Sequence, residues 1–240
     1  MNFSTTGFSY LSLSFALGFL IYRVFQYWKK EKDIVSKLWL YISFLFWLFT
    51  FIHAIGGLFF ATNLTFLRFG LNLGVFLQAI AFSLMSYFSV YVKFSSKISP
   101  WWGFFPVFIL GMISTYLTTI SPKNPFLEPS GAINWSVSVV PTFGNILRIF
   151  LFLIAFIPAI FVLFEQFQKA QDTYTKRKTL GFVILFLIVI MGASFDFNFI
   201  NIFKLDPIWR DIAFIFSSIV ILIAIVPGQK EESVKKIKSN

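Results

Sequence analysis

Residues 38–60, LWLYISFLFWLFTFIHAIGGLFF, run for 23 positions without a lysine, arginine, aspartate or glutamate. About 20 helical residues are enough to cross a hydrocarbon core of about 30 Å. The run is apolar on every side of a helix, whereas a helix on the surface of a soluble protein is apolar along one stripe. This stretch therefore predicts a transmembrane helix.

Six further runs of similar character surround it, so we expect an all-α polytopic membrane protein with seven transmembrane helices. The runs are continuous and lack the alternation of strands in a membrane barrel. No break in composition suggests a second domain, so residues 1–228 form one transmembrane domain and residues 229–240 a short basic cytoplasmic tail. The predicted helices lie near residues 8–28, 38–60, 66–92, 101–120, 142–165, 179–200 and 208–227.

The basic residues predict the orientation of the helices. Fourteen of the 20 lysines and arginines fall in the gaps that follow the first, third, fifth and seventh runs, and four fall in the other gaps. Positive charge collects on the cytoplasmic side, so we expect the N-terminus outside and the C-terminus inside. The predicted inner residues are Lys29, Lys30, Lys32, Lys37, Lys93, Lys97, Lys169, Lys176, Arg177, Lys178, Lys230, Lys235, Lys236 and Lys238, and the outer ones are Arg68, Lys123, Lys204 and Arg210.

A band of polar residues is expected in the outer third of the membrane. Polar groups inside a membrane are costly and usually face the protein interior or a water-filled cavity. We interpret Arg148 as an anion anchor that pairs with Asp196 or Asp211; the alternative is an ion-pair network that fixes helix packing. The candidate ligand-binding residues are Arg148, Asp196, His53, Asn72, Asn145 and Asp211.

Several function classes are disfavoured by residues that the sequence lacks. The chain has no cysteine and a single histidine, His53, which excludes disulfides, thiolate sites and a bis-histidine haem within one chain. The last predicted helix has no lysine for a retinal Schiff base. No catalytic pair or metal-ligand spacing is visible, so we expect no enzyme, metal or cofactor, and the net charge of +10 reflects membrane topology and not nucleic-acid binding.

Aromatic and turn residues suggest how the helices meet the membrane surfaces. The external loop, residues 121–141, either caps the outer mouth or is an ordinary connector. Pro106 and Pro158 are expected to kink their helices. His53, next to Gly56 and Gly57, is interpreted as a packed or hydrogen-bonded side chain, and the alternative is a proton-sensing role. An interfacial belt is predicted from six tryptophans: Trp28, Trp39, Trp101, Trp102, Trp135 and Trp209.

The segment around the last three predicted helices carries a family resemblance. The polar stretch QKAQDTYTKRK, residues 168–178, is followed by Thr179-Leu180-Gly181, then by GASFDF, residues 192–197, and by a turn with Asp206-Pro207. With Trp47 and Trp135 in the expected places, this pattern resembles the seven-helix N-terminal input module of bacterial histidine kinases and diguanylate cyclases, here without an output domain. The resemblance implies a sensor in a bacterial inner membrane.

These observations favour a noncatalytic receptor that binds a small ligand in an outward-facing cavity and signals to a separate cytoplasmic protein. A small transporter or channel is the alternative, and its candidate polar residues deeper in the membrane are Gln78, Ser83 and Ser86. A structural subunit of a membrane complex is the third possibility. Each of these places the chain in a lipid bilayer, with a small molecule, a signalling protein or a membrane-complex subunit as partner.

Overall fold

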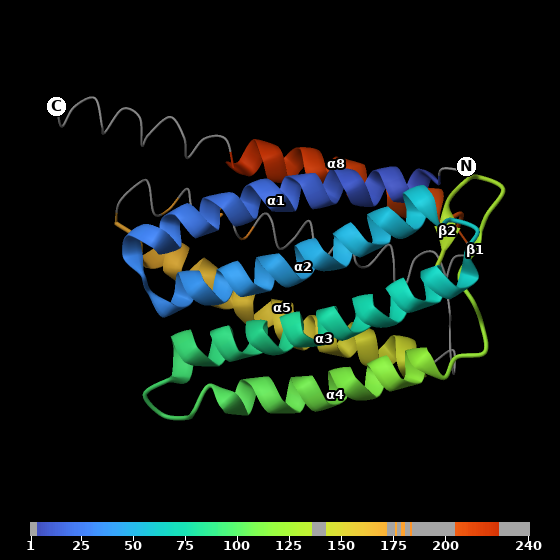
Figure 1. Cartoon of the computed structure of the whole chain (residues 1–240). Helices are drawn as coiled ribbons and strands as arrows, with labels where there is room; N and C mark the ends of the chain where they lie inside the picture. Colours follow the sequence, from blue (N-terminus) through green and yellow to red (C-terminus); the bar gives the residue numbers. More distant parts are fainter. Residues whose placement is uncertain are drawn as a thin grey trace.

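The structure is a computed structural model that describes residues 4–135, 143–171, 176, 179, 180, 183 and 205–225. The described chain is mostly helical (Figure 1). The predicted sixth helix and the basic tail lie almost wholly outside the described residues. The helices are α1 (Thr5–Glu31), α2 (Ile34–Phe59), α3 (Leu64–Phe94), α4 (Trp101–Thr119), α5 (Phe143–Lys169) and α8 (Ile208–Ile225), and the strands are β1 (Phe126–Leu127) and β2 (Ile133–Asn134).

Five of these helices, α1 to α5, are long and apolar enough to cross a membrane. Their bounds agree with the predicted runs to within a few residues, and the extra residues extend the helices beyond the apolar core. α4 and α5 each continue through an internal proline, Pro106 and Pro158. The described part of the chain thus confirms the helical class, and α1 to α5 have the length and composition of membrane-spanning helices.

Short polar turns set the helix ends. Ser4 caps α1, Asp33 caps α2 and Asn63 caps α3, each by accepting a hydrogen bond from the backbone amide three residues later. At the C-terminal end of α4, the Arg68 side chain of α3 donates to the carbonyl oxygens of Thr119 and Ser121, at 2.9 and 2.6 Å. A cation at a helix C-terminus satisfies orphan carbonyls and complements the helix dipole.

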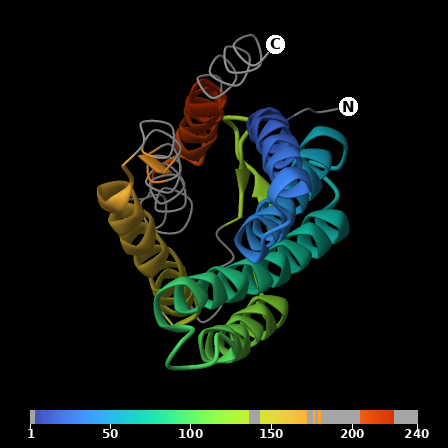
Figure 2. The same cartoon turned by 90° about the vertical axis from the view of Figure 1, so that its left-hand side faces the viewer.

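α3 lies at the centre of the packing. It packs against α2, α4 and α5, whereas α1 packs against α2 and α8, and α4 lies on the outside of the bundle (Figures 1 and 2). Small residues bring the helices close: a Cβ on Gly57 of α2 would lie 2.5 Å from the backbone of Gly7 in α1, and one on Gly111 of α4 would lie 2.6 Å from Ala79 in α3. Close backbone approach at small residues is the usual way that membrane helices pack.

The two ends of the bundle differ in structure. One, the hairpin end, holds the start of α1, the start of α8 and the antiparallel hairpin of β1 and β2, in which Phe126 pairs with Asn134 and Gly131 adopts a positive φ of 81°. The other, the lysine end, is formed by the α1–α2 and α3–α4 turns and the end of α5 (Figure 1). Within the described part of the long loop, residues 121–135, Ala132 and Ile133 are completely buried.

The predicted tryptophan belt is wrong for two of its members. Trp39 is 7% exposed and packs edge-on against Phe88 of α3, with ring centroids 4.9 Å apart, and Trp135 is 9% exposed. The position of a residue along a helix fixes its depth in the membrane but not the side that it faces, so depth alone cannot separate a belt residue from a core residue. Trp101, Trp102 and Trp209 are exposed, as a belt requires.

Candidate functional site

The N-terminus of α1 is anchored among three other parts of the chain. The Ser4 hydroxyl donates to the carbonyl of Gly57 at the end of α2, at 2.8 Å, and the Thr5 amide donates to the carbonyl of Gly131 in the hairpin, at 2.9 Å. Ser4 and Thr6 are completely buried. The first turn of α1 is thus inserted between α2, the hairpin and α8.

The start of α8 places two opposite charges beside this turn. Asp206 accepts from the Ile208 amide at 2.9 Å and from the Ser130 hydroxyl of the hairpin at 2.8 Å, so it both caps the helix and ties it to the loop. Arg210 and Asp211 follow in the first helical turn, where an acidic side chain is favoured by the helix dipole. Arg210 is 1% exposed and Asp211 is 2% exposed.

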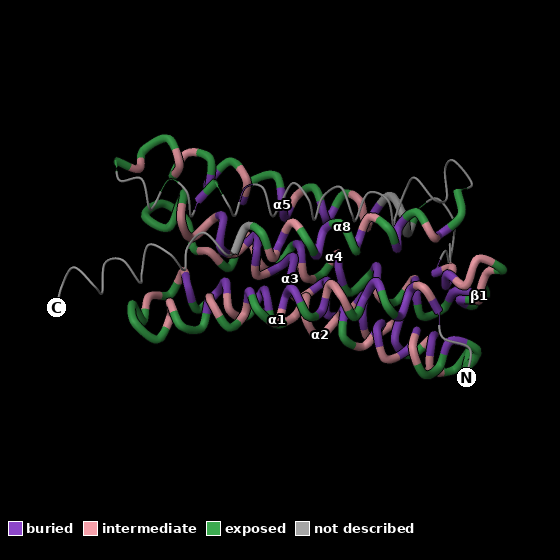
Figure 3. The backbone as a smooth tube through the Cα atoms, turned by 90° about the horizontal axis from the view of Figure 1, so that it is seen from above, coloured by how far each residue is buried: buried purple, intermediate pink, exposed green. Residues whose placement is uncertain are grey.

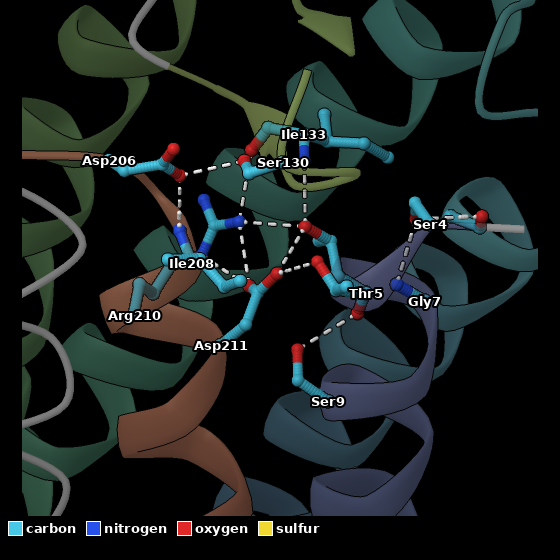
Figure 4. Close-up of polar contacts among 12 residues, drawn as sticks. Ser4, Thr5, Gly7, Ser9, Ser130, Ile133, Asp206, Ile208, Arg210 and Asp211 are labelled. Atoms are coloured by element: carbon cyan, nitrogen blue, oxygen red, sulfur yellow. Dashed lines mark hydrogen bonds and ion pairs between the residues drawn. The ribbon is translucent and has the colours of Figure 1, made fainter. Parts of the chain in front are cut away.

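Arg210 and Asp211 form a buried ion pair whose hydrogen bonds reach α1 and the hairpin (Figure 4). One carboxylate oxygen of Asp211 accepts from the guanidinium of Arg210 at 2.8 and 3.1 Å, and the other accepts from the hydroxyls of Thr5 and Thr6, both at 2.8 Å. Arg210 also donates to the carbonyl of Ile133 at 2.9 Å. These five residues are the outer polar layer.

Thr6 is the centre of that layer. Its hydroxyl donates to Asp211 and accepts from the backbone amide of Ile133 at 2.7 Å and from Arg210 at 2.9 Å. One donor and two acceptors are the full capacity of a hydroxyl. A buried charge pair is tolerable only when its remaining hydrogen bonds are made, and Thr6 supplies them. The layer is therefore suited to holding α1, α8 and the hairpin together.

An aromatic layer lies directly beneath. His53 of α2 is stacked on Tyr10, with ring centroids 5.1 Å apart, and contacts Phe49 at 4.4 Å and Trp135 at 4.7 Å. Tyr10 also meets Phe214 of α8 edge-on at 5.1 Å. The Nδ1 atom of His53 lies 2.8 Å from the carbonyl oxygen of Phe49. The five rings form a packed cluster, which agrees with the prediction of a packed histidine.

The two layers are stacked by sequence spacing. Tyr10 follows Thr6 by four residues and Phe214 follows Arg210 by four, so each pair lies on one helix face, one turn apart. The helix α3 leaves space for the His53 imidazole at Gly74, where a Cβ atom would lie 2.4 Å from the ring. Glycine at position 74 is thus required for the imidazole to lie against α3.

The predicted site residues divide between described and undescribed parts of the chain. Asp211 lies in the outer polar layer, where its carboxylate pairs with Arg210. His53 lies in the aromatic layer, and Arg148 lies on α5, partly exposed. Asp196 and the side chain of Asn145 lie outside the described residues, so the predicted pairing of Arg148 with Asp196 stays a prediction.

Asn72 is not brought to His53. It is two residues from Gly74, which contacts the imidazole, and two residues turn a helix by about 200°. It is seven residues from Ala79, which lies against Gly111 of α4, and seven residues return almost to the same face. Asn72 therefore faces the α4 side of α3, where its side-chain oxygen is buried without a hydrogen-bond partner.

The polar residues deeper in α3 are part of close helix packing. Ser83 donates to the carbonyl of Ala79 at 2.7 Å. The carbonyl of Ser86 would lie 2.7 Å from a Cβ on Gly103 of α4, so little space separates the two helices there. Gln78 is also buried. The serines fit the small-residue seam between α3 and α4.

The sequence predictions missed four residues of the two layers: Arg210, Thr6, Tyr10 and Ile133. Arg210 was counted among the outer cations and not among the candidate site residues, although its position directly before Asp211 in the first turn of a helix was a signal for local pairing. Thr6 and Ile133 carry no sequence signal, because their roles depend on contacts with residues more than 70 positions away.

The described residues contain no group of three or more histidine, cysteine, aspartate or glutamate side chains arranged to hold a metal ion. The chemistry of the hairpin end is one of fixed charges, hydroxyls and aromatic rings. Comparisons with protein-family models, curated proteins and solved structures found no match for this chain.

Proposed function

We propose that the chain is a bacterial inner-membrane protein of seven transmembrane helices, with its N-terminus outside, that acts as a noncatalytic sensor. In this proposal α8 follows the sixth helix predicted from residues 179–200 and serves as the seventh span. A small ligand binds in the outer half of the bundle near Arg148 and His53, and a separate cytoplasmic protein receives the signal.

One observation carries this proposal: the hairpin end ties α8 to α1 and to the hairpin through a buried, hydrogen-bonded pair of opposite charges. A change at the outside can thus reach α8, which runs toward the lysine end. A ligand shifts such an equilibrium only through different affinities for the two arrangements. The proposal therefore needs a ligand that binds best when the outer polar layer is either intact or open.

The charge distribution favours detection over transport. In α1 to α5 and α8, the charged residues lie toward the helix ends, and the central turns carry none. A transport path would need polar groups along the middle of the bundle. The buried serines of α3 lie instead beside tight α3–α4 contacts, at Gly103 and Gly111.

Topology can be tested by single-cysteine labelling, because the natural chain has no cysteine. Thr62 and Ser96 are exposed in turns at opposite ends of the bundle. In whole cells, a membrane-impermeant maleimide should label Thr62→Cys directly and Ser96→Cys only after permeabilisation. The opposite pattern would reverse the proposed orientation, and labelling of both would contradict a membrane crossing between them.

Ligand binding can be tested by thermal unfolding of the purified protein with a panel of organic carboxylates and phosphates. A compound present at about 100 times its Kd should stabilise the native chain by about 2.7 kcal/mol. Arg148→Ala should remove that stabilisation while the variant still inserts into the membrane. Arg68→Ala, which removes a cation that contacts the C-terminal end of α4, is the control and should be stabilised as much as the native chain. A stabilisation that persists in Arg148→Ala would reject the site, and no stabilising compound in the panel would count against an anion sensor.

A further inference from the structure

The lysine end carries a dense set of exposed cations. In residues 29–37, 93–97 and 165–169, which the structure describes, seven lysines are exposed and three carboxylates are present, which leaves a surplus of four positive charges there. The turns here are coloured mostly as exposed in Figure 3. The lysines are Lys29, Lys30, Lys32, Lys37, Lys93, Lys97 and Lys169, and the carboxylates are Glu31, Asp33 and Glu165.

Two of the three carboxylates are already engaged. Glu165 pairs with Lys93 of α3 and with Lys169 one turn along α5, at 2.7 Å in the second case. Asp33 accepts from the Ser36 amide at 2.8 Å and from the Ser36 hydroxyl at 2.6 Å. Glu165 and Asp33 thus serve internal contacts, and Lys29, Lys32 and Lys97 are exposed at the same end.

Exposed apolar side chains lie next to one of these lysines in the α3–α4 turn. Lys97 lies in the α3–α4 turn between Phe94 and Ile98, which are 45% and 47% exposed, and Trp101 and Trp102 follow at 51% and 75%. Exposed tryptophans lie at the headgroup level of a bilayer, and long lysine side chains reach from that level toward the polar surface. The turn is therefore built to place apolar groups in the membrane and an ammonium group at the phosphates.

We propose that the lysine end is a binding surface for anionic phospholipids, whose phosphate headgroups pair with Lys29, Lys32 and Lys97. The charge surplus matches the negative cytoplasmic leaflet, where each basic residue near the surface contributes about a fivefold gain in partitioning. This surface rests on the proposed membrane topology but not on the sensor function or on Arg148.

The test uses the full-length chain in nanodiscs made from equal parts of phosphatidylcholine and phosphatidylglycerol, with retained lipids counted by native mass spectrometry. We expect the native chain to retain phosphatidylglycerol preferentially. Lys29→Gln/Lys32→Gln/Lys97→Gln should lower that preference by at least about tenfold. The matched Arg triple variant keeps the charge and should keep the preference, and Lys123→Gln, at the hairpin end, should leave it unchanged.

Each other outcome would overturn the proposal. Equal retention of the two lipids by the native chain, or equal preference in the native and Gln variants, would show that the lysines select no lipid. A preference that does not fall as salt rises from roughly 0.05 to 0.5 M would exclude an electrostatic origin. Inorganic phosphate that stabilises the detergent-solubilised chain as well as phosphatidylglycerol does would assign the surface to free phosphate. Correct labelling of Thr62→Cys and Ser96→Cys in the same preparation separates these failures from a wrong topology.

Discussion

The hairpin end and the lysine end of this bundle treat charge in opposite ways. At the hairpin end Arg210 and Asp211 are buried and use their hydrogen-bonding groups on α1 and the hairpin. At the lysine end seven lysines are exposed, and the internal ion pairs are partly open to solvent. Buried, interlocked charges should control the stability and geometry of the fold, whereas exposed charges should control what the surface meets.

The largest predicted effect comes from breaking the buried pair. Arg210→Ala leaves the Asp211 carboxylate buried without its cation, which should cost about 3–5 kcal/mol of the free energy of unfolding. Arg210→Met/Asp211→Leu removes both charges and should recover much of that loss. Denaturant unfolding in detergent, followed by circular dichroism, measures both variants.

Lys97→Ala is the matched change at the other end, and its effect on the free energy of unfolding should stay within about 0.5 kcal/mol. Similar losses for Lys97→Ala and Arg210→Ala would remove the contrast between the two ends.

A smaller effect is expected at the crossing of α1 and α2. Gly57→Ala places a Cβ 2.5 Å from the backbone of Gly7, so the helices must separate, at a cost of about 1–3 kcal/mol. Gly18→Ala in the same pair of helices meets nothing closer than 3.7 Å and should be neutral or slightly stabilising. Thermal unfolding compares the two, and equal melting temperatures would show that the close approach is not needed.

A further effect, at the lysine end, depends on pH and is smaller than the effects of Arg210→Ala and Gly57→Ala. Burial would raise the pKa of Asp33, but the hydrogen bonds from Ser36 outweigh it and hold the pKa below its ordinary value of 3.8. The carboxylate therefore stabilises the folded state at neutral pH, and this contribution is lost as pH falls below about 4 and through the lowered pKa. Asp33→Ala should cost about 1 kcal/mol at pH 7.

Asp33→Asn keeps a capping oxygen but does not titrate. The difference in melting temperature between the native chain and Asp33→Asn should shrink as pH is lowered through this range. A difference that stays constant from neutral to acid pH would show that the charge of Asp33 has no part in capping α2.

The positions of the helices can be predicted well from the sequence, because contact with lipid favours apolar residues on every side of a helix. The run at 38–60 became α2, Ile34–Phe59, and the run at 66–92 became α3, Leu64–Phe94. Because every side of such a helix is apolar, the sequence does not show which side faces the protein interior. Asn72 and His53 have similar predicted depths, yet the first faces the α4 side of α3 and the second lies against Gly74.

The candidate site was predicted only in part. His53 and Asp211 were recognised because charged and ionisable groups stand out in an apolar sequence. Their partners were not, since Thr6 and the Ile133 backbone are ordinary until the chain folds around them. Arg210 was used only as an outer cation in the orientation argument. Its burial depends on the contact with Thr6, across 204 residues, because arginine is almost never fully buried unless it is paired.

The placement of Thr6 has a consequence for biogenesis. This side chain is near the start of the chain, but its arginine partner is synthesised 204 residues later. At roughly 5–20 residues per second, that delay is on the order of 10 to 40 s. During this interval the first turn of α1 lacks its partners on α8, and the synthesis of α8 supplies them. The contacts of Thr6 with α8 can therefore form only after Asp211 has been synthesised.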